Sequence, residues 1–162
     1  DIDPLTTTAD ALHDSLSHIG AELLMNTLSR LEHTQALPQA ENGATHAEKV
    51  SKEEAKLDFR KSSNEVAAMI HGLSSSPGAY FETEDGTIYK ILEASVSDVS
   101  GSADCEPGTI VDSDFNIACG RGGSIRPVVI QKQFKKKINS FCNGLISKYL
   151  TSFSVSFRKI FD

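Results

Sequence analysis

The feature of this sequence that most constrains its fold is a change of hydrophobic period at residues 74–78, SSSPG. The apolar residues before it are spaced as on one face of a helix: Val66, Met69, Ile70 and Leu73. After it, short apolar runs alternate with turn residues, and Asp85-Gly86 between two such runs is a strong hairpin signal. The pattern therefore predicts a short helix followed by an antiparallel sheet.

Five strands are predicted after this change of period, at residues 79–83, 87–96, 109–111, 117–119 and 125–131. Ser62 followed by Glu65 is a capping-box pattern that predicts the start of the preceding helix. Five short strands with one helix are typical of a small, closed or nearly closed barrel. Pro127 predicts that the last strand lies on an edge or carries a bulge.

A helical stripe precedes these elements over residues 8–31. Its apolar members recur mostly at steps of three and four: Leu12, Leu16, Ile19, Leu23, Leu24, Leu28 and Leu31. Thr8 or Asp10 is the expected cap, and Gly20 predicts a break into two helices. The apolar face of this stripe needs a partner elsewhere.

Two segments without clear periodicity separate the stripe from the barrel. Residues 32–48 gather Pro38, Asn42 and Gly43, which is typical of a loop. Residues 49–59, KVSKEEAKLDF, mix charges with the apolar residues Val50, Leu57 and Phe59. This segment is interpreted either as a connector anchored at both ends or as a solvated linker, and composition alone favours the linker.

The carboxyl-terminal residues predict less. Residues 138–145 favour a closing helix, whereas the segment from Tyr149 to Phe161 fits helical steps and, in part, strand alternation. A tail helix docked on its own domain is favoured there over a membrane-surface helix.

Charge is distributed unevenly along the 162 residues. Residues 1–120 hold seven Lys and Arg against twenty-one Asp and Glu, whereas the remainder holds nine Lys and Arg against Asp162 alone. Such asymmetry points to a nucleic-acid or membrane partner. Six basic residues are candidates for nucleic-acid contact on one rim of the barrel: Arg121, Arg126, Lys132, Lys135, Lys136 and Lys137.

Other function classes lack support in the sequence. The chain shows no nucleophile with a base, no opposed carboxylates and no metal cluster at an informative spacing, so no catalytic or metal-binding residue is predicted. His71 is interpreted as a partly exposed helix residue, and the glycines at 120–123 as a hairpin turn. Three separated cysteines and the lack of a long apolar run predict reduced thiols in a soluble, cytoplasmic protein. The first residue, Asp1, suggests a piece of a longer protein.

Several motifs, in this order, resemble the carboxyl-terminal half of methionyl-tRNA formyltransferases. They are KVSKEEAKLDF, SSNEVAAMIHGL, SPGAYFE, TIYKILEA, EPGTIV, IACGRGG, and Gln131 with Lys135 and Lys136. The leading helical stripe is similar to the helices that end the family's Rossmann-like catalytic domain. The resemblance implies that residues 1–33 are the end of that domain, 34–60 a linker, and 61–162 a domain that resembles an oligonucleotide-binding (OB) fold.

The resemblance also implies a function for the parent protein. It would transfer a formyl group from 10-formyltetrahydrofolate to methionine on initiator tRNA in translation initiation. The family's catalytic residues match no position of this chain, so we expect an inactive fragment that contacts tRNA. We also expect the parent enzyme to be a monomer. Two alternatives stay open: the corresponding domain of a nucleotide-sugar formyltransferase, and a non-catalytic interaction module.

Overall fold

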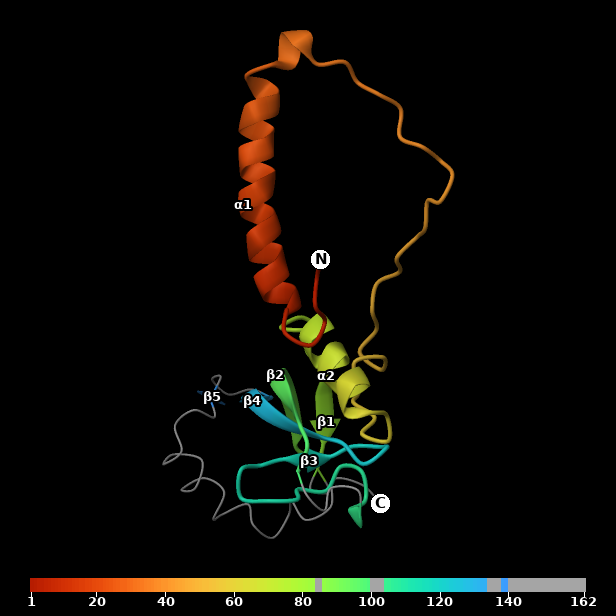
Figure 1. The fold of residues 1–162 in the computed structure, drawn as a ribbon, viewed down its shortest axis with the longest axis vertical. Helices are drawn as coiled ribbons and strands as arrows, with labels where there is room; N and C mark the ends of the chain where they lie inside the picture. Colours follow the sequence, from red (N-terminus) through yellow and green to blue (C-terminus); the bar gives the residue numbers. More distant parts are fainter. Residues whose placement is uncertain (84–85, 100–103, 134–137, 140–162) are drawn as a thin grey trace.

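The structure is a computed structural model that describes residues 1–83, 86–99, 104–133 and 138–139 (Figure 1). A curled antiparallel sheet with helix α2 against it forms the body, and helix α1 extends away from that body. This is a mainly β, OB-like fold with flanking helices, as the sequence predicted. The elements are α1 (Ala9–Leu28), the 3-10 helix η1 (Leu31–His33), α2 (Ser63–Gly72), β1 (Tyr80–Glu82), β2 (Ile88–Ser97), β3 (Ile117–Ala118), β4 (Ser124–Lys132) and β5 (Ile138–Asn139).

The sheet has the strand order β1-β2-β4-β3, and β5 also pairs with β4. All these pairings are antiparallel. Of the predicted strands, residues 109–111 contribute only an isolated bridge between Ile110 and Ile117. The other four predicted strands are present, with boundaries that differ by a few residues.

Pro127 lies inside the sheet and not on an edge strand. Strand β4 has β2 on one side and β3 and β5 on the other. Pro127 is paired with Ala94, beside an irregularity of β2 between Ile91 and Ala94. A bulge leaves part of the ladder unpaired, so a residue without an N–H is tolerated there. The bulge alternative is confirmed and the edge alternative is wrong.

Residues 55–62 form a strap that connects the two sides of the sheet. At one end, the Leu57 amide donates to the Tyr80 carbonyl over 2.7 Å, and the Tyr80 amide donates to Ala55 over 2.9 Å. At the other end, the Gly120 amide donates to the carbonyls of Phe59 and Lys61, each over 2.8 Å. The strap thereby pairs groups of β1 and of the β3–β4 turn that an open sheet would leave exposed.

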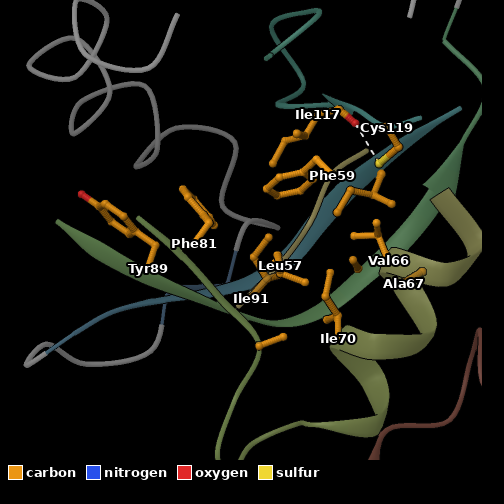
Figure 2. Packing of buried hydrophobic residues seen from close by; sticks show 13 residues of the cluster. Leu57, Phe59, Val66, Ala67, Ile70, Phe81, Tyr89, Ile91, Ile117 and Cys119 are labelled. Atoms are coloured by element: carbon orange, nitrogen blue, oxygen red, sulfur yellow. Dashed lines mark hydrogen bonds between the residues drawn. The ribbon is translucent and has the colours of Figure 1, made fainter. Parts of the chain in front are cut away.

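The core lies between α2, the strap and the concave face of the sheet (Figure 2). Phe59 and Phe81 meet edge to face with ring centroids 6.1 Å apart, and Phe81 stacks on Tyr89 at 5.8 Å. Leu57 and Phe59 are 2 % and 1 % exposed, whereas Val50 is 42 % exposed. This burial supports the anchored interpretation of the segment for Leu57 and Phe59, although composition favoured a solvated linker.

Helix α2 begins as its sequence predicts. The Glu65 amide donates to the Ser62 hydroxyl, while the Ser62 amide donates to the Glu65 carboxylate over 3.0 Å. The predicted capping box is therefore confirmed. Val66 and Ile70 point from α2 into the core.

Helix α1 is one uninterrupted helix, so the predicted break at Gly20 is wrong. Thr8 caps it by accepting from the Ala11 amide over 3.2 Å. No residue of α1 is buried, and its large apolar side chains from Leu16 to Leu28 are more than half exposed. The helix itself extends away from the barrel (Figure 1). The closing helix predicted over residues 138–145 is wrong at its start, because Ile138 and Asn139 form strand β5 paired with β4. Residues 140–145 and the tail beyond them lie outside the described residues. Within the described part of the chain, no helix combines the length and the apolar character that a membrane crossing requires.

Candidate nucleic-acid interface

The structure describes three of the six predicted candidates, Arg121, Arg126 and Lys132, and they lie toward the two ends of β4. Arg121 occupies the β3–β4 turn with a positive φ of 61°, and Gly122 follows with a φ of 80°. The turn thus holds two successive residues in the left-handed region, which presents the Arg121 side chain outward. Arg121 is exposed, as a phosphate contact requires.

Arg121 lies near the beginning of α2, although the two are far apart in the sequence. A parallel bridge joins Ser62 to Gly120, and Lys61 and Arg121 flank it. The Glu65 carboxylate is close enough to Arg121 and Lys61 to feel their charges. Its pKa is held below the ordinary value mainly by hydrogen bonds from Ser62, and further by the charges of Arg121 and Lys61. These two cations therefore share one small region with a single carboxylate.

Lys61 is a candidate that the sequence did not single out. Only the Arg60-Lys61 dipeptide before the capping box marks it, and nothing local predicts its proximity to Arg121. Arg60 is less available, because its Nε and Nη2 donate to the two carboxylate oxygens of Asp58 over 2.8 and 2.9 Å. This pairing lowers the pKa of Asp58 and raises that of Arg60.

Arg126 is exposed on β4, opposite Ser95 of β2. Since side chains alternate along a strand, Arg126 lies on the same face of β4 as Val128. No ion pair involves Arg121 or Arg126 among the described residues. Both guanidinium groups are thus available to an anionic partner in the described part of the chain.

Lys132 ends β4 and is paired with Tyr89. Its Nζ lies 5.6 Å from the centre of the Tyr89 ring, within the range of a cation–π contact. The Tyr89 ring is itself part of the core, because it is 8 % exposed and stacks on Phe81. The core therefore orients Lys132.

The described basic residues do not form one cluster. Strand β4 has nine residues, and at a rise of about 3.3 Å per residue its ends are separated by about 26 Å. Arg121 and Arg126 lie near its start and Lys132 near its end. Lys135, Lys136 and Lys137 lie outside the described residues, so the convergence of all six on one rim stays a prediction.

His71 is a buried structural residue, 2 % exposed, and not the partly exposed helix residue that its sequence position predicted. The Ala94 amide donates to its Nε2 over 3.2 Å, and its Nδ1 lies 3.1 Å from the Pro4 carbonyl oxygen. Because Nε2 accepts, Nδ1 carries the proton and donates to Pro4. Neither nitrogen is left for acid–base chemistry.

A shallow hollow of about 410 Å³ opens beside His71, between the N-terminal segment and β2. His71 is its one buried polar side chain, and both ring nitrogens are engaged in hydrogen bonds.

Burial raises the pKa of the Cys119 thiol to about 12, which removes this thiol as a nucleophile. No group of three or more potential metal ligands occurs in residues 1–83, 86–99, 104–133 and 138–139.

Comparison with known protein families gives a match over residues 49–145 to the formyl transferase, C-terminal domain. This range includes the strap, α2 and every described strand.

Individual relatives match a larger share of the chain than the family model does. The chain is 40 % identical over 132 residues to the methionyl-tRNA formyltransferase of Paramagnetospirillum magneticum, covering 80 % of this chain and 41 % of that protein. It is 41 % identical over 146 residues to that of Roseobacter denitrificans, covering 89 % and 46 %. For Brucella anthropi the identity is 40 % over 151 residues, covering 88 % and 48 %. The chain thus spans less than half the length of these relatives.

Among solved structures, HypX from Aquifex aeolicus, a variant with six substitutions, has a similar fold. The TM-score is 0.57 at 16 % identity, covering 80 % of this chain and 23 % of that one. At this identity the likeness concerns the fold alone.

Proposed function

Since this chain belongs to the formyl transferase C-terminal domain family, we propose that it is the tRNA-contacting part of a methionyl-tRNA formyltransferase. The observation that carries the proposal is the family match over 49–145 together with relatives of about 40 % identity that bear this name. The parent enzyme transfers a formyl group from 10-formyltetrahydrofolate to methionyl initiator tRNA in the cytoplasm, and acts as a monomer.

The barrel contributes positioning to this reaction. Arg121 and Arg126 at one end of β4 and Lys132 at the other offer cations spaced along a strand. Contacts of this kind neutralise phosphates and fix the orientation of a nucleic acid without reading its sequence. Lys135, Lys136 and Lys137 continue the basic run, and the missing N-terminal catalytic domain supplies the chemistry.

The folate donor binds outside this chain in the proposal. The hollow beside His71 does not fit it, because no buried polar side chain there is unengaged. No reaction step is therefore assigned to residues of this chain.

Measurement of tRNA affinity against salt concentration tests the proposal. The chain should bind initiator tRNA with an affinity that falls as salt rises, by a slope of about 0.7–0.9 per phosphate contact. Replacing Arg121 and Arg126 by Glu should reduce that slope, as should replacing Lys135, Lys136 and Lys137. Arg30→Glu, at an exposed position before η1, is the control with the same change of charge per residue outside the barrel, and it should leave the slope nearly unchanged. An affinity for tRNA that does not depend on salt refutes the proposal and favours a non-catalytic interaction module.

A second assay addresses catalysis. The chain alone, incubated with methionyl initiator tRNA and the formyl donor, should produce no formylmethionyl-tRNA. Turnover by the isolated chain contradicts the absence of a catalytic centre. A parent enzyme that formylates a nucleotide sugar, without competition by tRNA, would replace the proposed substrate.

A further inference from the structure

Helix α1 is attached to the barrel in two ways, and only one of them can fix its direction. The covalent route leaves the far end of α1 and returns through residues 34–54 as a long arc (Figure 1). Every residue of that stretch is exposed. A segment without buried anchors restrains the separation of its ends but not their orientation.

The second attachment lies at the base of α1. Asp10, in the first turn of α1, accepts from the Ser75 amide over 2.9 Å and from the Ser75 hydroxyl over 3.3 Å. Ser75 belongs to the corner between α2 and β1. A carboxylate that accepts from a backbone N–H and a hydroxyl makes charge-assisted bonds, which are stronger than neutral ones.

The residues before α1 add a second pair of contacts. The Pro4 carbonyl accepts from Nδ1 of His71 over 3.1 Å, and Leu5 packs against the apolar core. His71 is itself fixed by the Ala94 amide of β2. We call the contacts of Asp10 with Ser75 and of Pro4 with His71 the joint at the base of α1. Its Pro4 side is connected to α2 and β2 through the His71 imidazole.

Local hydrogen bonds make the joint a single rigid piece. The Asp3 carboxylate accepts from the Leu5 amide over 2.9 Å and from the Thr6 hydroxyl over 3.1 Å. Thr8 then caps α1. Pro4 and Asp10, six residues apart, are thus held in one turn-and-helix unit, and two separated bonds to the barrel define a direction where one would permit rotation.

The direction of α1 matters because its apolar face is uncovered among the described residues. Seven apolar side chains of α1 and η1, from Leu16 to Leu31, are between 53 and 67 % exposed. The relatives are more than twice as long as the region matched here. On the proposed function, we take the catalytic portion of the parent enzyme as the occupant of this face.

We infer that Asp10 and His71 are positioning residues for formyl transfer: they hold α1, and the catalytic portion packed on it, in one orientation relative to the barrel that contacts tRNA. This inference rests on the proposed function. Reacting groups must be aligned closely, and a displacement of about 1 Å can reduce a rate about a hundredfold. A joint at the base of a twenty-residue helix converts a small change of angle into a large displacement at its far end.

Residual dipolar couplings of the chain itself test the joint without any assay of function. In the unchanged protein, amides of α1 and of the barrel should fit one common alignment. Asp10→Ala should reduce the couplings of α1 while leaving those of the barrel unchanged. Asp10→Asn keeps an oxygen acceptor in place and should restore most of the common alignment. Asp14→Ala is the matched control, because Asp14 pairs only with His13 of the same helix among described residues.

Kinetics of the parent enzyme test the consequence. Asp10→Ala should lower kcat for methionyl initiator tRNA about tenfold or more, with KM for the formyl donor unchanged and Asp10→Asn close to the unchanged enzyme. Independent motion of α1 and the barrel in the unchanged chain overturns the inference. If Asp10→Ala reduces the dipolar couplings of α1 but leaves kcat unaltered, the positioning role is overturned and the proposed function stays intact. A parent that never formylates methionyl-tRNA removes the proposed function, whatever the couplings show.

Discussion

The backbone of Gly120 lies directly against the backbone of Arg60, so that a Cβ on Gly120 would overlap the Arg60 carbonyl group. The Gly120 amide uses this approach to bond Phe59 and Lys61 of the strap. One glycine thus joins the strap to the β3–β4 turn, connects that turn to the start of α2, and places Arg121 beside Lys61.

Gly120→Ala should therefore destabilise the barrel by about 2 kcal/mol, the usual range for an added methyl group without space. Urea denaturation measures the change in the free energy of unfolding. Gly72→Ala is the matched control, because no atom lies within 4 Å of a Cβ there, and it should be neutral or stabilising. A Gly120→Ala protein as stable as the Gly72→Ala protein contradicts the close approach.

His71 should exist as the Nδ1–H tautomer in the folded protein, because its Nε2 accepts from Ala94. Long-range nitrogen–proton NMR spectra distinguish the two tautomers. His71→Leu should cost about 1–3 kcal/mol, since the buried Ala94 amide loses its acceptor. His13→Leu, at an exposed position of α1, should leave barrel stability unchanged. Protonated Nε2 in the spectrum would show the arrangement to be wrong.

Cys119 should resist thiol reagents in the native protein. Burial raises its pKa to about 12, so at pH 8 only about one molecule in ten thousand carries the thiolate. Peptide mapping after brief alkylation should show Cys105, which is half-buried, modified at least about tenfold faster than Cys119. In denaturant the two rates should converge. Equal native rates would mean that the thiol of Cys119 is accessible.

The capping box of α2 should make stability depend on pH through Glu65. Hydrogen bonds from Ser62 lower the folded pKa of Glu65 from its ordinary value of 4.5. The ionised carboxylate therefore stabilises the fold above that value, and this stabilisation is lost as the pH falls through the lowered folded pKa. The difference in unfolding free energy between the unchanged protein and Glu65→Gln should shrink toward acid pH. Glu93→Gln, on the exposed side of β2, provides the reference, and a constant Glu65→Gln difference from neutral to acid pH would exclude the mechanism.

Local chemistry in the sequence determined much of this structure. The Ser62–Glu65 capping box, the helical spacing from Val66 to Leu73 and the strands on either side of the Asp85-Gly86 signal depend on neighbours within a few residues. Such interactions are encoded where they act. The run of basic residues after residue 120 is likewise a property of the sequence alone, as is the apolar stripe of α1.

Only the tertiary structure decided how these pieces meet. The break expected at Gly20 does not occur, because an isolated glycine in a long helical pattern weakens the helix without ending it. The hydrogen bond from the Gly120 amide to the Phe59 carbonyl of the strap, and the contacts of His71 with Pro4 and Ala94, join residues far apart in the sequence. At least one partner in each of these bonds is a backbone N–H or C=O that becomes unavailable to water only when the chain is folded, and nearly every residue carries the same backbone groups. Residue types therefore indicated the elements, whereas the strap across the curled sheet, the separation of Arg121 from Lys132 and the joint at Asp10 followed from the packing.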